Sequence, residues 1–194
     1  AGLKSIVAGL CLVLIFMILY YNKGGAVADV ALFVNIFFII GMLAQFGASL
    51  TLPGLAGIVL TIGMSIDANV LIFERIKEEL ASGKSALKSI ELGFDKALIT
   101  ILDSNITTFA TGAILAYFGS GPVKGFAITL MIGIACSFFT AVFVSRLIIS
   151  YLAKKNEGKN IHFETFLSKG LLTNVNISFV SKRKMAYIFS GAII

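Results

Sequence analysis

The chain has 194 residues, of which 58% are hydrophobic and 13% are charged, and its mean hydropathy is +0.97. Soluble domains carry about a quarter charged residues, so this composition excludes an ordinary soluble domain and indicates a polytopic membrane protein. The net charge of +6 lies in short segments between apolar runs. It therefore predicts membrane topology and gives no support for a nucleic-acid partner.

The apolar runs predict an all-α fold, because a helix needs about 20 apolar residues to cross a bilayer. We expect five complete transmembrane helices and the start of a sixth. The complete spans lie near residues 3–21, 30–47, 55–73, 97–118 and 123–152, and the sixth begins near residue 183. The third span continues to Leu80 as a charged amphipathic stretch, and residues 84–96 are expected to form a short surface helix.

The two ends of the chain lie inside apolar runs. Ala1 stands almost directly at the start of the first run, and Ile194 ends a run of about ten residues, half of what a span requires. Both ends favour a fragment of a longer protein.

Lysine and arginine residues are distributed very unevenly between the two sides of the predicted bundle. One side holds 14 of the 16, and the other holds only Lys4 and Lys124. Since cytoplasmic loops of membrane proteins are enriched in these residues, loops 22–28, 74–96 and 146–184 are expected in the cytoplasm.

Two carboxylates lie well inside the predicted spans. Asp67 precedes Glu74 by seven residues, and Asp103 follows Lys96 by seven residues. At 1.5 Å per residue, each lies about 10 Å from the same membrane surface, on consecutive antiparallel helices. An intramembrane carboxylate is costly and usually marks an ion or proton pathway, so both are predicted to carry protons.

The two carboxylates share a local pattern, Asp67-Ala68-Asn69 and Asp103-Ser104-Asn105. Two steps along a helix turn a side chain by about 200°, so each Asn points nearly opposite to its Asp. We expect a supporting polar seam between the helices, in which hydrogen bonding is the favoured role of each member. Its predicted members are Asn69, Asn105, Thr107 and Thr108.

The sequence gives no support for an enzyme. Cys11 and Cys136 are isolated in apolar segments and are read as packing residues, and no Cys/His cluster suggests a metal. No phosphate-binding loop or nucleophile elbow is present, so no catalytic residue and no cofactor are predicted. An intramembrane aspartyl protease is disfavoured because Met64-Ser65-Ile66 precedes Asp67 in place of Gly-x-Gly.

Four stretches resemble the SecD family of protein-export membrane subunits. The longest runs from Leu52 to Glu79 around Ser65-Ile66-Asp67-Ala68-Asn69, and the others are residues 100–108, 119–127 and 139–146. The resemblance covers residues 1–153, as a five-helix transmembrane bundle. Residues 176–184, with Ser190-Gly191, resemble the start of SecF, which implies a cytoplasmic linker at 154–182 and a SecF-like helix beginning at 183–194.

This resemblance implies half of a pseudo-twofold bundle of the resistance-nodulation-division superfamily. It implies an auxiliary subunit of the Sec translocase in the bacterial inner membrane, driven by the proton-motive force. Asp67 falls on the family's proton-relay helix and Asp103 on its accompanying acidic position. The implied partners are the SecF half, extracytoplasmic domains, a SecYEG-type channel, unfolded exported polypeptides and the lipid bilayer.

Two questions stay open at the level of the sequence. A proton-coupled exporter of small molecules or lipids from the same superfamily is the alternative function. The coupling ion could be the proton or sodium, and no basic partner for Asp67 lies within the spans.

Overall fold

The computed structural model describes residues 2–46, 51–155, 187 and 190. The predicted linker at 154–182 and the predicted SecF-like helix at 183–194 lie outside the described residues, apart from Lys154, Lys155, Tyr187 and Ser190. These two predictions therefore stay untested.

The described part of the chain is a bundle of helices without strands, as the sequence predicts. The helices are α1 (Gly2–Tyr21), α2 (Lys23–Gln45), α3 (Leu52–Ala81), α4 (Ala86–Phe118), α5 (Pro122–Phe139), the π-helix η1 (Thr140–Val144) and α6 (Ser145–Lys155). Within this part, α2, α3, α4 and the continuous run Pro122–Lys155 are long and apolar enough to cross a membrane, and α1 supplies a shorter apolar helix, Val7–Tyr21.

The predicted loop at 22–28 is wrong, because α2 already begins at Lys23. Only Asn22 separates α1 from α2, and it has a positive φ of 53°, a region in which asparagine is enriched among non-glycine residues. The glycines that suggested a turn serve packing instead. A Cβ atom on Gly25 would collide with the carbonyl oxygen of Met17, so glycine allows α1 and α2 to approach closely beside the turn.

The expected surface helix at 84–96 is also not separate, because α4 continues through Lys96 without a break. The other helix boundaries follow ordinary end signals. Thr51 caps α3 by accepting a hydrogen bond from the Gly54 N–H at 3.2 Å, and Pro53 lies in the first turn. Helix α5 begins with proline at its first position, Pro122, after the N-cap residue Gly121, whose φ is 52°.

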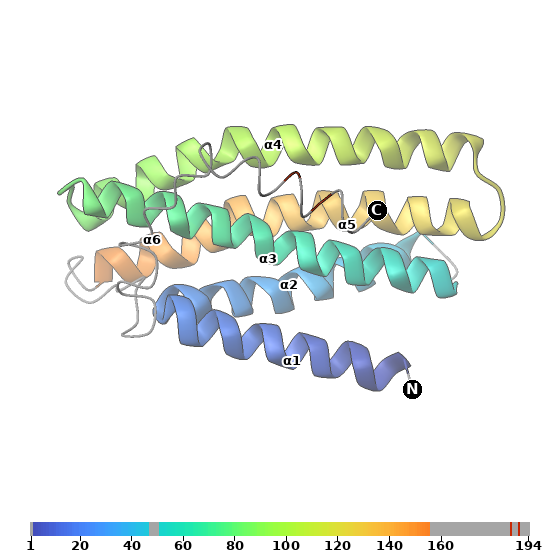
Figure 1. The fold of residues 1–194 in the computed structure, drawn as a ribbon, viewed down its shortest axis with the longest axis horizontal. Helices are drawn as coiled ribbons and strands as arrows, with labels where there is room; N and C mark the ends of the chain where they lie inside the picture. Colours follow the sequence, from blue (N-terminus) through green and yellow to red (C-terminus); the bar gives the residue numbers. More distant parts are fainter. Residues whose placement is uncertain (1, 47–50, 156–186, 188–189, 191–194) are drawn as a thin grey trace.

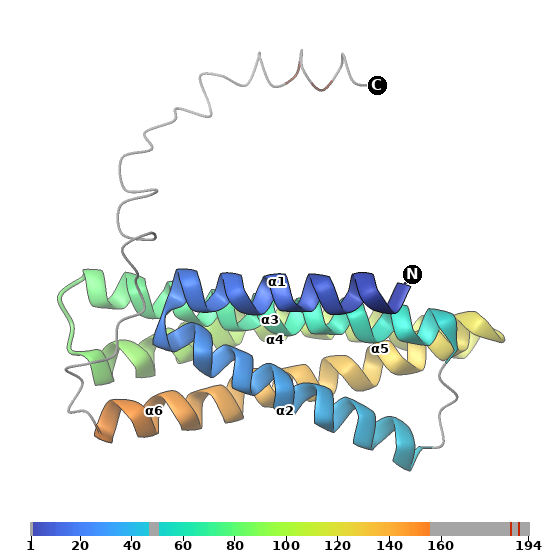
Figure 2. The ribbon, with the colours of Figure 1, turned by 90° about the horizontal axis from the view of Figure 1, so that it is seen from below.

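Helices α3 and α5 form the centre of the bundle (Figure 1). Both pack against α4 on one side and against α2 on the other. Helix α1 packs mainly on α2, and the two diverge from their turn (Figure 2). We call the end of the bundle that holds Asn22, residues 74–96 and residues 146–155 the basic end.

Buried apolar side chains form two clusters along the bundle. The large cluster, nearer the basic end, includes Met17, Phe73, Ile76, Phe94 and Ile149. The small cluster consists of Ile39, Leu43 and Cys136, with Ile58 and Ile132 packed against it. In a membrane such clusters stabilise the fold by close packing, since lipid tails are as apolar as the side chains.

Small residues make this close packing possible at two levels. A Cβ atom on Gly93 of α4 would lie 2.8 Å from the backbone nitrogen of Ile76 on α3. One on Gly133 of α5 would lie 2.5 Å from the hydroxyl oxygen of Thr61 on α3. The first contact brings the backbones of α3 and α4 together, and the second leaves room for only the small Thr61 side chain between α3 and α5.

Candidate functional site

The central helix α3 has two different faces at the level of Asp67. Thr61, Ser65 and Asn69 are buried in the bundle, whereas the Asp67 side chain is exposed on the surface of the chain. The helical period of 3.6 residues explains this, because residue 67 is turned by about 200° from both 65 and 69. The carboxylate thus faces away from the helices that pack on the other side of α3.

Asp67 lies beside a cavity of about 140 Å³ between α3 and α4. From α3, the cavity is lined by Met64, Asp67, Ala68 and Leu71; from α4, it is lined by Thr100, Ile101, Ser104 and Asn105. Three of the four residues from α4 are polar. The cavity therefore offers the carboxylate a polar environment inside an otherwise apolar region.

Asp103 is exposed on α4 and does not line this cavity. The register of the two helices is given by the contact of Gly93 with Ile76. Counting nine residues along each helix away from the basic end, the same register places Leu102 of α4 beside Asp67 of α3. Asp103 therefore lies close to the level of Asp67. This agrees with the expected depth, although the two carboxylates do not share the cavity.

Asn69 does not join a seam with Asp67. Its Oδ1 atom accepts a hydrogen bond from the Ser145 hydroxyl at 2.7 Å, and its Nδ2 atom donates to the Ser65 carbonyl at 3.0 Å. Both bonds are buried, and the first joins α3 to α6. Asn69 is therefore a connection on the opposite face of α3.

The remaining members of the expected seam lie on α4. The hydroxyls of Thr107 and Thr108 donate to the backbone carbonyls of Asp103 and Ser104, at 2.8 and 2.9 Å. Only Asn105 of the four seam residues lines the cavity of Asp67. The expected seam is thus reduced to one amide that shares a cavity with one carboxylate.

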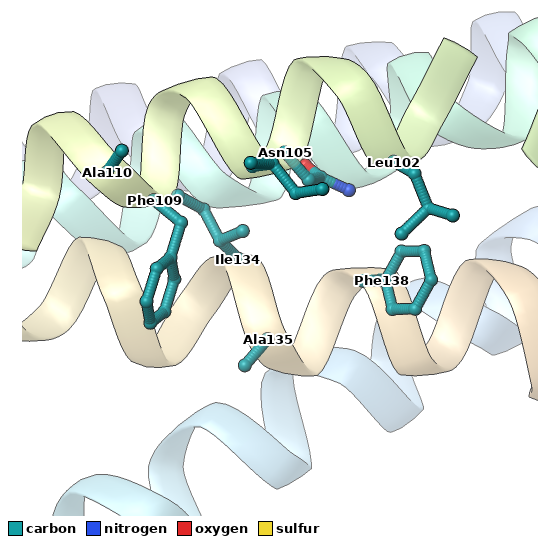
Figure 3. Close-up of a pocket in the computed structure, with 8 residues that line it drawn as sticks. Leu102, Asn105, Phe109, Ala110, Ile134, Ala135 and Phe138 are labelled. Atoms are coloured by element: carbon teal, nitrogen blue, oxygen red, sulfur yellow. The ribbon is translucent and has the colours of Figure 1, made fainter. Parts of the chain in front are cut away.

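Asn105 also lines a second cavity, an apolar groove of about 300 Å³ between α4 and α5 (Figure 3). Its other walls include Leu102, Ile106, Phe109 and Phe138. The half-buried amide therefore stands at the boundary between the polar cavity of Asp67 and an apolar surface of the bundle.

Neither Asp67 nor Asp103 has a hydrogen-bond or ion-pair partner for its carboxylate among the described residues. Arg146, at the basic end of the bundle, pairs with Asp95 at 3.2 Å.

The carboxylates at the basic end are in the opposite situation. Glu79 is almost fully buried and accepts hydrogen bonds from both Lys84 and Lys96, which lowers the pKa of its carboxyl group below the usual value. Glu74 accepts hydrogen bonds from the Tyr21 hydroxyl at 2.8 Å and from Lys77 at 3.2 Å. These pairs fasten α1, α3 and α4 together.

Further ion pairs at the basic end are short-range and exposed. Arg75 pairs with Glu78 at 2.7 Å, and Lys88 pairs with Glu91 at 2.8 Å. The Lys88 pair lowers the pKa of the Glu91 carboxyl and raises that of the Lys88 ammonium. Exposed pairs of this kind contribute little to stability.

A third carboxylate within the apolar helices, Asp29, was missed in the sequence because the second span was expected to begin at Val30. In the structure Asp29 lies in the second turn of α2 and is 8% exposed, with one carboxylate oxygen lacking a hydrogen-bond partner among the described residues. Buried positions of α2 recur at helical spacing at Leu32, Asn35, Ile39 and Leu43. Extending that period back by one turn from Leu32 would have identified Asp29.

Among the described residues there is no group of three or more His, Cys, Asp or Glu side chains that could hold a metal ion. The fold and site thus define a helical membrane bundle with an unpaired carboxylate on its central helix.

Comparison with known proteins identifies the family of this bundle. Residues 1–155 match the family described as protein export membrane protein SecD/SecF, C-terminal. The chain belongs to this family.

Individual relatives agree with this assignment. The chain is 61% identical over 152 residues to the protein translocase subunit SecD of Rhodothermus marinus. The aligned region covers 78% of the chain and 24% of that protein. It is 52% identical over 159 residues to the SecD subunit of Syntrophobacter fumaroxidans. This alignment covers 82% of the chain and 30% of that protein. The chain thus spans about a quarter to a third of the curated relatives it matches.

Solved structures of SecDF resemble the fold. A crystal structure of a Thermus SecDF, described as a translocon-associated membrane protein, aligns with a TM-score of 0.87 and 36% identity over 99% of this chain and 26% of that one. A second SecDF structure, in a super-membrane-facing form, aligns with a TM-score of 0.77 and 41% identity, covering 79% and 21%.

Proposed function

We propose that the chain is the transmembrane part of a SecD-type subunit that uses the proton-motive force to assist protein export across the bacterial inner membrane. One observation carries the proposal. Asp67 lies on the central helix, next to a cavity lined by Ser104 and Asn105, and its carboxylate has no partner among the described residues. A carboxylate retained in an apolar span without a structural partner indicates a functional role.

In this proposal, Asp67 binds a proton from one side of the membrane and releases it to the other. Protonation removes the charge, so the neutral acid tolerates apolar surroundings that the carboxylate does not. The ionised form instead favours a conformation that supplies a cation or water. The proton gradient thereby shifts a two-state equilibrium of the bundle.

The partners in this proposal follow from the family. The exposed face of α3 and α4, which carries Asp67 and Asp103, would pack against a SecF half that supplies the missing basic group. Extracytoplasmic domains would bind the unfolded polypeptide as it leaves a SecYEG-type channel. The basic end would lie in the cytoplasm, in keeping with the enrichment of Lys and Arg in cytoplasmic loops.

The decisive variant is Asp67→Asn in the full-length protein, with Glu91→Gln as the control. The control removes a carboxylate that lies outside the apolar part of the bundle and pairs with Lys88. We expect Asp67→Asn to abolish proton uptake by proteoliposomes and the stimulation of export by the proton-motive force. Glu91→Gln is expected to leave both unchanged.

Unchanged proton uptake and export in the Asp67→Asn protein would contradict the proposal. Replacing the proton gradient by a sodium gradient in the same proteoliposomes identifies the coupling ion. Export that responds to sodium alone would retain the role of Asp67 but reject the proton as its ligand.

A further inference from the structure

A polar layer crosses the bundle between the two apolar clusters. On α2, Asn35 lies between Ala28 of the large cluster and Ile39 of the small cluster. On α3, Ser65 lies between Ile58 and Ile72, which belong to the small and large clusters respectively. We call Asn35, Ser65, Ser137 and Thr140 the mid-bundle polar layer.

The last two members stand where α5 changes into a π-helix. Ser137 and Thr140 lie between Cys136 of the small cluster and Ala141 of the large cluster, and η1 begins at Thr140. Phe38 of α2, one turn from Asn35, contacts Phe139, which lies between Ser137 and Thr140, with ring centroids 5.8 Å apart. On α3, Ser65 lies midway between Thr61, which contacts Gly133, and Asn69, which contacts Ser145. These contacts place all four members at the same level of the bundle. π-helical turns occur often at functional sites because they disturb the regular backbone hydrogen bonds.

Two members of the layer have unused hydrogen-bonding capacity in a fully buried position. The Asn35 side chain is 0% exposed, and neither its Nδ2 nor its Oδ1 atom has a hydrogen-bond partner among the described residues. The Ser65 side chain is 1% exposed, and its hydroxyl also lacks a partner there. An unpaired polar group is costly when buried in a protein, and more so in hydrocarbon.

The other two members keep acceptor capacity. The Ser137 hydroxyl donates to the Ile134 carbonyl at 3.0 Å, and the Thr140 hydroxyl donates to the Cys136 carbonyl at 3.0 Å. Each hydroxyl uses its only hydrogen atom in this way and retains oxygen lone pairs that can accept a hydrogen bond. The layer therefore offers a mixture of donors and acceptors.

We propose that the mid-bundle polar layer is an internal water-binding site. A water molecule both donates and accepts hydrogen bonds, so it can accept from the Asn35 amide nitrogen and donate to the Asn35 and Ser137 oxygens. A cation cannot use the amide N–H groups, and an anion cannot use the acceptor oxygens. The composition of the layer thus selects a neutral ligand that is both donor and acceptor.

This water site is separate from the cavity of Asp67. Ser65 and Asn69 lie on the buried face of α3, whereas Asp67 lies on the exposed face. None of the four layer residues lines the Asp67 cavity. The proposal is therefore independent of proton coupling by Asp67.

Hydroxyl-radical labelling of the full-length protein in nanodiscs tests the site, because X-ray irradiation creates radicals from bound water. Cys136 is the reporter, since it is 8% exposed and directly precedes Ser137. Met17, a sulfur-containing residue of the large cluster that is 1% exposed, is the dry reference. We expect Cys136 to be modified faster than Met17 in the unmodified protein, after each rate is divided by the rate of the same amino acid in an unstructured peptide.

Three variants separate bound water from general access. Asn35→Leu and Ser65→Ala are expected to reduce the normalised modification rate of Cys136 severalfold. Thr61→Val is the control, because Thr61 is equally buried one turn away on α3 but its hydroxyl already bonds the Ile58 carbonyl at 2.9 Å. It should leave the Cys136 rate unchanged.

Equal normalised rates for Cys136 and Met17 in the unmodified protein would overturn the proposal without any variant. An unchanged Cys136 rate in both Asn35→Leu and Ser65→Ala, or an equal decrease in Thr61→Val, would also overturn it. Ser65→Ala removes a single oxygen atom and keeps the test available if Asn35→Leu does not fold.

Discussion

The two Asp-x-Asn motifs, at 67–69 and 103–105, have the same pattern but occupy different environments. Both aspartates are exposed on the surface of the chain. Asn69, however, is buried and bonded to Ser145, whereas Asn105 is half-buried between two cavities. The difference arises because α3 is packed on two sides and α4 lies at the side of the bundle. The same motif can therefore serve packing on one helix and a cavity on the next.

The largest loss of stability is expected where the buried face of α3 is packed most tightly. Gly133→Leu would force a side chain against Thr61, where even a Cβ atom would lie 2.5 Å from its hydroxyl. Overpacking of this kind costs about 1–3 kcal/mol. Titration of the purified full-length protein with denaturing detergent would measure the change in free energy of unfolding.

Gly63→Leu is the matched control for the opposite face. Gly63 is exposed on α3, and a Cβ atom there would have no neighbour within 4 Å. This variant is expected to be neutral or slightly stabilising, because leucine is a better helix former than glycine. Equal losses for the two variants would show that the faces of α3 do not differ as described.

The next effect separates the two asparagines directly. Asn69→Ala removes two buried hydrogen bonds and leaves the Ser145 hydroxyl unpaired. Interhelical hydrogen bonds in membranes average about 0.6 kcal/mol, and an unpaired buried partner raises the cost, so a loss of about 1 kcal/mol is expected. Asn105→Ala should change the free energy of unfolding by less than about 0.5 kcal/mol. Similar losses in the two variants would mean that Asn105 has a structural partner too.

A smaller and pH-dependent effect is expected for Glu79. Its folded-state pKa lies below the usual glutamate value of about 4.5 because Lys84 and Lys96 donate hydrogen bonds to it. Folding therefore favours the ionised form. Its contribution is complete above pH 4.5 and is lost as the pH falls through the lowered pKa.

Thermal unfolding of the full-length protein across this acidic range would measure the contribution of Glu79. On acidification, the midpoint temperature of unfolding should fall more for the unmodified protein than for the Glu79→Gln protein. Glu91→Gln, which affects an exposed pair, should resemble the unmodified protein more closely. If Glu79→Gln kept the full acid dependence, another carboxylate would be responsible.

The smallest effect is expected for the exposed aspartates themselves. Asp67→Asn and Asp103→Asn remove carboxylates without a partner among the described residues, so neither should reduce stability by more than about 0.5 kcal/mol. Detergent titration of both variants beside Asn69→Ala would complete the comparison. A clear loss would assign these carboxylates a structural contact.

The sequence predicts the helical fold and the opposite orientations of Asp67 and Asn69 because both depend on local periods. Apolar runs define the helices, and the 200° rotation between residues 67 and 69 separates the two side chains. The sequence does not predict that Asn69 contacts Ser145, because this depends on how α6 is placed after the π-helix. Asp29 was missed for a different reason, since Gly24-Gly25 looks like a turn while it serves close packing against Met17.

The π-helix between α5 and α6 has a consequence for how this sequence can change over time. Each residue added to or removed from a helix turns everything beyond it by about 100°. Loss of one codon within Thr140–Val144 would turn α6 away from its neighbours, with Ser145 leaving Asn69 and Arg146 leaving Asp95. Length in this five-residue segment is thus under tighter constraint than residue identity, and insertions or deletions there should be rarer than substitutions.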